Sequence, residues 1–281
     1  MANNEMKKKI RKLLRNRSLL VGALLFLAIT FAVFVLPFFM QLDPLEMHYD
    51  RMLLPPGEGG ILGTDEMGRD LFSRLIKGGQ ASIVIGLCVM IATAIIGTVI
   101  ALFAGYYPTV DMITMRVMDV MMSFPALLLA IALLAVFQNS PAGVILALTI
   151  VYTPRTARMV RASVLTLKNE TYIEAARAIG VRDYVTLFRH ILPGAIPVLI
   201  VQESFLFAYA ILAEAGISFV GVGIQPPMPS WGNILGDARA LMREAPWMVF
   251  APGFAIMLCV LSLNLLGDGL REALDPKRKK G

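Results

Sequence analysis

Apolar residues in this 281-residue chain gather into six long runs that are separated by shorter, more polar segments. The runs cover about residues 19–40, 82–105, 117–137, 142–160, 196–219 and 247–266. A helix that crosses a membrane needs about 20 mostly apolar residues, and every run comes close to that length or exceeds it. We therefore predict an all-α membrane protein with six transmembrane helices.

Composition supports a membrane protein and gives its orientation. Hydrophobic residues make up 57% of the chain and charged residues 16%, whereas a soluble domain has about 45–50% and about 25%. Most of the 26 Lys and Arg residues lie in the N-terminus, the C-terminus and the segment between the fourth and fifth runs. Because basic residues concentrate in cytoplasmic segments, we expect both termini in the cytoplasm. The net charge of +6 then reflects topology, and no nucleic-acid partner is expected.

The pattern divides the chain into two parts. Residues 1–75 form an N-terminal segment with the first span and an extracytoplasmic loop, and residues 76–281 form a core of five spans. Within the core, residues 168–193 are a polar cytoplasmic island. Thr171 and Glu174 have the spacing of a capping box, so we expect a short helix to begin there. Gly180 is suited to end that helix, since this position usually requires a positive φ.

A second short helix is expected directly after the first one. Asp183 is placed to cap its start, and Pro193 is expected to stop it. The first helix also carries Ala175 and Ala176, and Leu192 precedes the proline. The sequence therefore predicts two short helices joined at a glycine, on the cytoplasmic side of the membrane.

Ionisable residues inside the spans are candidates for function, because a charge in the membrane is costly. Glu203 lies in the fifth run, and we consider two roles for it: a group facing a transport pathway, or a carboxylate satisfied by neighbouring helices. Phe207, Met118 and Met122 are further pathway candidates, although ordinary packing also explains them. The two cysteines and two histidines are scattered, so no metal site is expected.

Three motifs resemble ABC importer permeases, the first of them such permeases in general and the other two the C-type permease subunit of the dipeptide, oligopeptide and nickel branch. One is the E-A-A-x₃-G loop with its later L-P, formed by Glu174, Ala175, Ala176, Gly180, Leu192 and Pro193. Another is L-G-T-D-x-x-G-R-D before the second run, with Asp65, Gly68, Arg69 and Asp70. The third is G-x-G-x-x-P-P-x-P-S-W-G, with Pro226, Pro227 and Trp231.

Local chemistry suggests roles for the two extracytoplasmic motifs. Asp65, Arg69 and Asp70 could form an ion-pair cluster that fixes the loop at the membrane surface. Trp231 could anchor its segment at the membrane interface.

The resemblance implies the type I ABC importer architecture and a set of partners. These would be a second homologous permease, two ABC ATPase subunits and an extracytoplasmic substrate-binding protein, in a bacterial or archaeal cytoplasmic membrane. Residues 168–193 would be the loop that docks on an ATPase. The chain has no G-x-x-x-x-G-K-[ST] phosphate loop, so ATP and Mg²⁺ would bind the partner ATPases and this chain would not be an enzyme.

The resemblance leaves the substrate open. Di- or oligopeptides are expected, with nickel, glutathione or opine-like compounds as alternatives within the same branch. Two readings from other classes remain: a secondary transporter that uses Glu203, and an intramembrane enzyme. Neither is favoured, since no inverted repeat and no nucleophile–base pair is visible in the spans.

Overall fold

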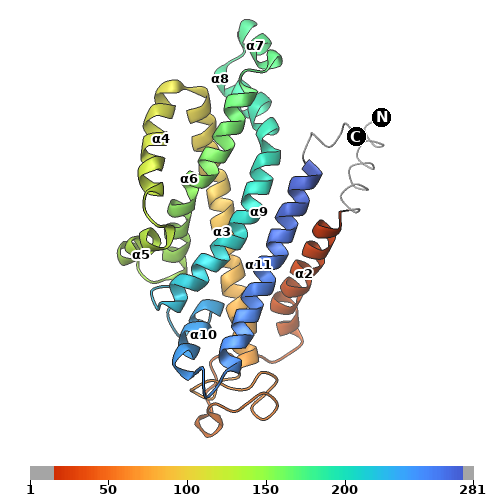
Figure 1. Cartoon of the computed structure of the whole chain (residues 1–281), viewed down its shortest axis with the longest axis vertical. Helices are drawn as coiled ribbons and strands as arrows, with labels where there is room; N and C mark the ends of the chain where they lie inside the picture. Colours follow the sequence, from red (N-terminus) through yellow and green to blue (C-terminus); the bar gives the residue numbers. More distant parts are fainter. Residues whose placement is uncertain (1–15, 275–281) are drawn as a thin grey trace.

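The computed structural model describes residues 16–274 and shows a bundle of long helices with short helices at its two ends (Figure 1). The long helices are α2 (Arg17–Phe34), α3 (Leu71–Tyr106), α4 (Pro108–Met122), α5 (Ala126–Phe137), α6 (Pro141–Leu167), α9 (Leu192–Phe219) and α11 (Trp247–Leu274). The short ones are α7 (Thr171–Ala178), α8 (Asp183–Val185), α10 (Trp231–Asp237), 3-10 turns at Leu36–Phe38, Tyr49–Arg51 and Ala238–Leu241, and a π-helical turn at Thr186–Ile191.

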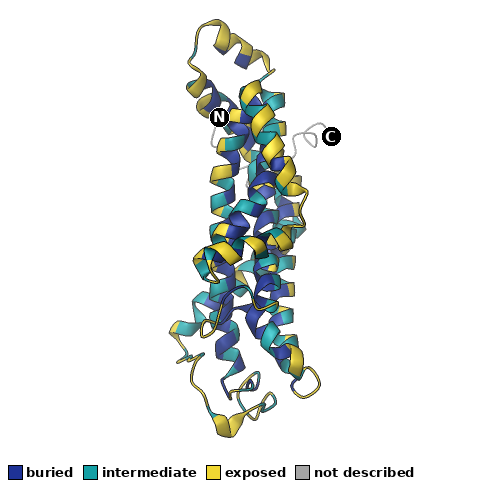
Figure 2. Ribbon diagram, turned by 90° about the vertical axis from the view of Figure 1, so that its left-hand side faces the viewer, coloured by how far each residue is buried: buried dark blue, intermediate teal, exposed yellow. Residues whose placement is uncertain are grey.

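Helices α3, α6 and α9 form the centre of the bundle and pack closely against one another. Helices α4 and α5 cover one side of α6, while α11 and α2 lie together on the other side of α9 (Figure 1). Buried side chains follow the axis of the bundle (Figure 2). Helices α7 and α8 lie at one end of the molecule and α10 lies near the other, and the start of α2 and the end of α11 point toward the end that carries α7 and α8 (Figure 1).

A stripe of small residues lets α3 approach α6. Thr93, Gly97, Ala101 and Gly105 recur every four residues along α3, and all four are buried. A Cβ atom added to Gly97 would lie 2.7 Å from the Cγ2 atom of Thr156 on α6. This agrees with the use of small residues where membrane helices pack closely.

Gly97→Ala is expected to lower the thermal stability of the detergent-solubilised protein, because the added methyl group overlaps Thr156. Overpacking of this kind costs about 1–3 kcal/mol. Gly216→Ala is the matched control, since its Cβ would meet nothing nearer than 3.7 Å and alanine favours a helix over glycine by about 1 kcal/mol. Equal melting temperatures for the two variants would contradict the close approach of α3 and α6.

The third apolar run is a broken element: the single span over 117–137, which was expected to be kinked at Pro125, is divided between two helices. Helices α4 and α5 meet at an angle of 97°. Pro125 lies at the break, where it lacks an N–H and disfavours helical geometry at Phe124. Helix α5 has 12 residues, about 18 Å in length, which is too short to cross a bilayer alone.

Four of the described helices are long and apolar enough to span a membrane, namely α2, α3, the stretch Asp183–Phe219 that contains α9, and α11. A fifth crossing results if the bent pair α4–α5 is counted as one span. Helix α6 has 27 residues, enough for about 40 Å, but arginines occupy its C-terminal part and only its first part is strongly apolar.

Helix α3 begins at Leu71, 11 residues before the expected start at residue 82. Asp70 caps this helix: its carboxylate accepts hydrogen bonds from the backbone N–H of Ser73 at 2.8 Å and from the Ser73 hydroxyl at 2.5 Å. The polar character of the first two turns had hidden their helical structure. At 36 residues, or about 54 Å, α3 extends well beyond the hydrocarbon layer.

The expected ion-pair cluster before α3 exists, but it contains Arg74 in place of Asp70. Asp65 pairs with Arg69 at 2.7 Å and also with Arg74, and all three side chains are almost fully buried. Asp70 is the helix cap and takes no part in the cluster. Gly68 has φ +71°, and a Cβ there would collide with the carbonyl oxygen of His48.

Trp231 does not anchor the chain at the membrane interface, contrary to expectation. Its side chain is 1% exposed, and its indole N–H donates a hydrogen bond of 2.9 Å to the carbonyl oxygen of Leu75. The tryptophan therefore holds α10 against α3. The preceding Pro226–Pro227 bond is cis.

Candidate coupling loop and translocation cleft

Residues 168–193 form a compact cap on one end of the bundle (Figure 1). Helix α7 carries Glu174 and Ala175 on its exposed side, whereas Ile173 and Ala176 are buried. Glu170 occupies the N-cap position and makes no side-chain cap, so the predicted capping box between Thr171 and Glu174 is wrong. Since Thr171 is the first helical residue, its side chain is one position too late to cap the helix.

The turn at Gly180 has the conformation that the sequence predicts. Gly180 has φ +80°, its N–H donates to the carbonyl of Arg177, and the N–H of Val181 donates to the carbonyl of Ala176. These two bonds define a Schellman motif. A Cβ at Gly180 would meet no atom within 4 Å, so glycine is needed here for its backbone conformation and not for space.

Two tyrosines at the end of α3 hold the loop in place. The hydroxyl of Tyr106 donates to one carboxylate oxygen of Asp183 at 2.7 Å, and that of Tyr107 to the other at 2.9 Å. The bond to Asp183 raises the pKa of Tyr107 above its ordinary value. The guanidinium of Arg177 lies over the Tyr106 ring, 4.7 Å from its centre. The adjacent pair of aromatic residues after the small-residue stripe was the sequence signal for this contact, and it was missed.

The second short helix differs from its prediction at both ends. Asp183 is the first residue of α8 and not its cap, since Arg182 holds the N-cap position. Pro193 does not stop the helix; it lies exposed in the first turn of α9, where a missing N–H costs nothing. A π-helical turn joins α8 to α9, and the half-buried Leu192 begins α9.

Large apolar side chains are exposed on this polar end of the molecule. Ile179 is 81% exposed, and Tyr172, Tyr184 and Phe188 are also exposed. Apolar groups that gather on a surface outside the lipid mark an interaction site. The loop therefore has a defined turn, hydrogen bonds to α3 and an apolar surface suited to a protein partner.

Glu203 lies in the centre of the bundle, bonded to both neighbouring helices. Its carboxylate accepts hydrogen bonds from Thr93 of α3 at 3.0 Å and from Thr156 of α6 at 2.6 Å. The residue is 5% exposed. Of the two roles considered from the sequence, this geometry matches a carboxylate satisfied by its neighbours.

The other pathway candidates have separate surroundings within residues 16–274. Phe207 is buried and packs edge-to-face on Phe26 of α2, with ring centres 5.7 Å apart. Met118 is buried on α4, whereas Met122 on the same helix is 45% exposed. The structure does not bring these three side chains and Glu203 together.

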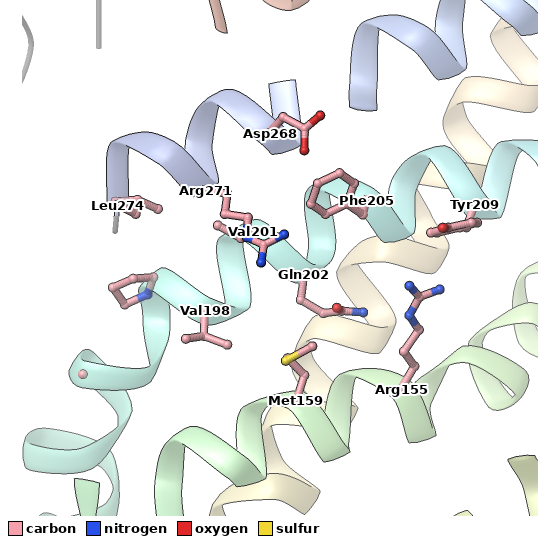
Figure 3. A pocket seen from close by; sticks show the side chains of 12 residues that line it. Arg155, Met159, Val198, Val201, Gln202, Phe205, Tyr209, Asp268, Arg271 and Leu274 are labelled. Carbon is pink, nitrogen blue, oxygen red and sulfur yellow. The ribbon is translucent and has the colours of Figure 1, made fainter. Parts of the chain in front are cut away.

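A cleft of about 830 Å³ opens on a different side of α9, between α6 and α11 (Figure 3). Its polar lining comes from Arg155, Gln202, Tyr209, Asp268 and Arg271, and its apolar lining from Met159, Pro197, Val198, Val201, Phe205 and Leu274. None of these residues is among the site candidates that the sequence indicates.

The arginines at the end of α6 have separate partners. Arg158 pairs with Asp119 and Arg161 with Asp111, both on α4. Arg155 instead lies over the ring of Tyr209, 4.5 Å from its centre.

Comparison with known proteins decides the family. A family profile described as "binding-protein-dependent transport system inner membrane component" matches residues 94–280. The chain belongs to this family. A second profile, the N-terminal TM domain of oligopeptide transport permease C, matches residues 6–56. The protein is thus a multi-pass membrane permease subunit of an ABC transporter and not an enzyme.

Similarity extends over nearly the whole chain for individual relatives. A putative peptide transport system permease protein of Brucella abortus is 44% identical, covering 96% of this chain and 91% of the relative. The glutathione transport system permease protein GsiD of Pectobacterium atrosepticum is 42% identical, covering 96% and 90%. The dipeptide transport system permease protein DppC of Alkalihalophilus pseudofirmus is 39% identical, covering 96% and 89%.

Proposed function

We propose that this permease carries di- or oligopeptides into a bacterial cytoplasm, driven by ATP hydrolysis on separate subunits. The names of its relatives support a peptide substrate, and glutathione, itself a small peptide, falls in the same chemical class. Nickel and opine-like compounds remain alternatives without a supporting observation of this chain. The proposed complex contains a second homologous permease, two ATPases that bind ATP and Mg²⁺, and an extracytoplasmic binding protein.

One observation carries the coupling role of residues 168–193: an exposed apolar surface on a loop that is itself firmly held. Ile179 and Tyr184 face solvent, while Asp183 is bonded to two tyrosines of α3. A force on this surface would be transmitted to α3 through these two hydrogen bonds. We place this loop, the start of α2 and the end of α11 in the cytoplasm, with six crossings in all.

Rocking of this chain against the second permease would then change the side to which the pathway opens. Such a transition needs an interface with two packed arrangements and no catalytic group. A secondary transporter would instead need an accessible ionisable group in the membrane. Glu203 is buried and already bonded to two threonines, which disfavours that role.

Copurification tests this proposal most directly. The tagged chain is extracted in mild detergent at native expression, and the copurifying proteins are identified by mass spectrometry. We expect a second permease and ABC ATPases, and ATP-dependent dipeptide uptake after reconstitution with the binding protein. A chain that purifies alone, under conditions that preserve known ABC importers, would contradict the proposal.

A further inference from the structure

The cleft between α6, α9 and α11 has the composition of a binding site for an anionic group. Arg155 and Arg271 carry two positive charges into its lining, against the single negative charge of Asp268. Figure 3 shows Gln202 between the two arginines, with the three side chains pointing into the space between the helices. Guanidinium groups suit carboxylates and phosphates because of their planar, forked donors.

Gln202 provides a second, independent indication of a ligand. The residue is 6% exposed, and its side-chain nitrogen has no hydrogen-bond partner among residues 16–274. An unsatisfied buried donor costs about 1–3 kcal/mol, and such groups are uncommon in folded proteins. A ligand acceptor entering the cleft would satisfy this amide.

Arg155 is presented to the cleft by a defined contact. Its guanidinium stacks on the half-exposed ring of Tyr209, whereas Arg158 and Arg161 are neutralised by carboxylates of α4. Stacking positions the guanidinium without using its N–H donors. Arg155 therefore keeps both its charge and its donors for a ligand.

The dimensions of the cleft suit an extended small molecule. Its lining on α9 runs from Gly194 to Tyr209, a rise of about 22 Å. It leads from the end of the bundle that carries the coupling loop toward the middle of α9 (Figures 1 and 3). Apolar residues of α9 and α11, including Val198, Phe205 and Leu274, line the rest of it and could contact side chains of varied shape.

We propose that Arg155, Gln202 and Arg271 form a carboxylate-binding subsite, which holds the C-terminal carboxylate of a peptide on its way to the cytoplasm. This inference rests on the proposed peptide import. It identifies the chemical group that this chain recognises within the pathway.

The test compares dialanine with dialanine amide, which lacks the terminal charge. The complete transporter is reconstituted in liposomes with its binding protein, and each probe is supplied at a concentration that gives equal occupancy of the binding protein. Uptake and ATP hydrolysis are recorded together. Because the binding protein is the same throughout, a change in the acid-to-amide uptake ratio reports on the permease.

Gln202→Leu and Arg155→Met are each expected to lower the acid-to-amide ratio roughly tenfold, the effect of losing a hydrogen bond to a charged group. Gln202→Glu adds a negative charge and should lower the ratio at least as far, which separates recognition from a general defect in packing. Ser204→Ala is the matched control on α9. Its hydroxyl bonds only to the carbonyl of Ile200 among the described residues, and it does not line the cleft.

An unchanged ratio in the Gln202 and Arg155 variants, with ATP-driven uptake intact, would overturn the subsite. The subsite would also be overturned if those variants changed only the dependence of uptake on phosphatidylglycerol in the liposomes. That result would indicate that the cleft binds a lipid phosphate. Absence of ATP-dependent uptake of both probes by the unmodified transporter is a different result, since it would reject peptide import itself and the subsite with it.

Discussion

Gly180→Val is expected to reduce peptide uptake roughly tenfold or more while the partner ATPases continue to hydrolyse ATP. Gly180 has φ +80°, a conformation that costs other residues about 1–2 kcal/mol and β-branched residues more. The variant would open the Schellman turn and change how α7 presents Glu174 and Ile179. Uptake per ATP hydrolysed, measured in proteoliposomes, is the quantity to compare.

Gly180→Asn provides the control for this experiment. Asparagine tolerates a positive φ better than other residues with a side chain, and nothing lies within 4 Å of the position that its Cβ would take. We expect Gly180→Asn to retain most of the coupling. If the valine and asparagine variants are equally impaired, the backbone conformation of Gly180 does not determine coupling.

Asp65→Asn is expected to prevent accumulation of the folded protein. Asp65 is fully buried between Arg69 and Arg74, which are 6% and 4% exposed in their side chains. Removing the carboxylate leaves two buried guanidinium groups without this anion, and breaking a buried ion pair costs about 3–5 kcal/mol. That is a large part of the 5–15 kcal/mol typical of a folded domain.

Glu66→Gln is the matched control, since it removes a carboxylate at the next position, which is only partly buried. Membrane content and the melting temperature in detergent measure the effect for both variants. We expect Asp65→Asn to lower both strongly and Glu66→Gln to leave them near the unmodified values. A stable Asp65→Asn protein would show that the cluster is dispensable for folding.

The apolar runs were sufficient to predict an all-helical membrane protein, because the length of a span is imposed by the bilayer. Helix ends were harder to predict. Helix α3 begins at Leu71 because Asp70 caps it, and this local cap lies within polar sequence. The angle of 97° between α4 and α5 depends on how α4 packs against α3 and α6 and how α5 packs against α6 and α9, which no local pattern specifies.

Within the candidate site, the sequence predicted backbone conformation better than it predicted the direction in which side chains point. The positive φ of Gly180 follows from its position after a short helix and was predicted. Glu203 was a pathway candidate because of its charge, but it is the neighbouring Gln202 that lines the cleft. Successive helical residues point about 100° apart. Because α9 is apolar on all sides, its sequence does not indicate which direction is the cavity.

Helix α3 connects the two ends of the molecule as one continuous element. It begins beside the buried cluster of Asp65 and Arg74 and ends at the tyrosines that hold Asp183. Helices α6, α9 and α11 each contain an internal proline, whereas α3 has none in its 36 residues. Prolines are the usual sites where helices bend. We therefore infer that α3 would transmit a displacement of residues 168–193 along its length with less bending than α6, α9 or α11.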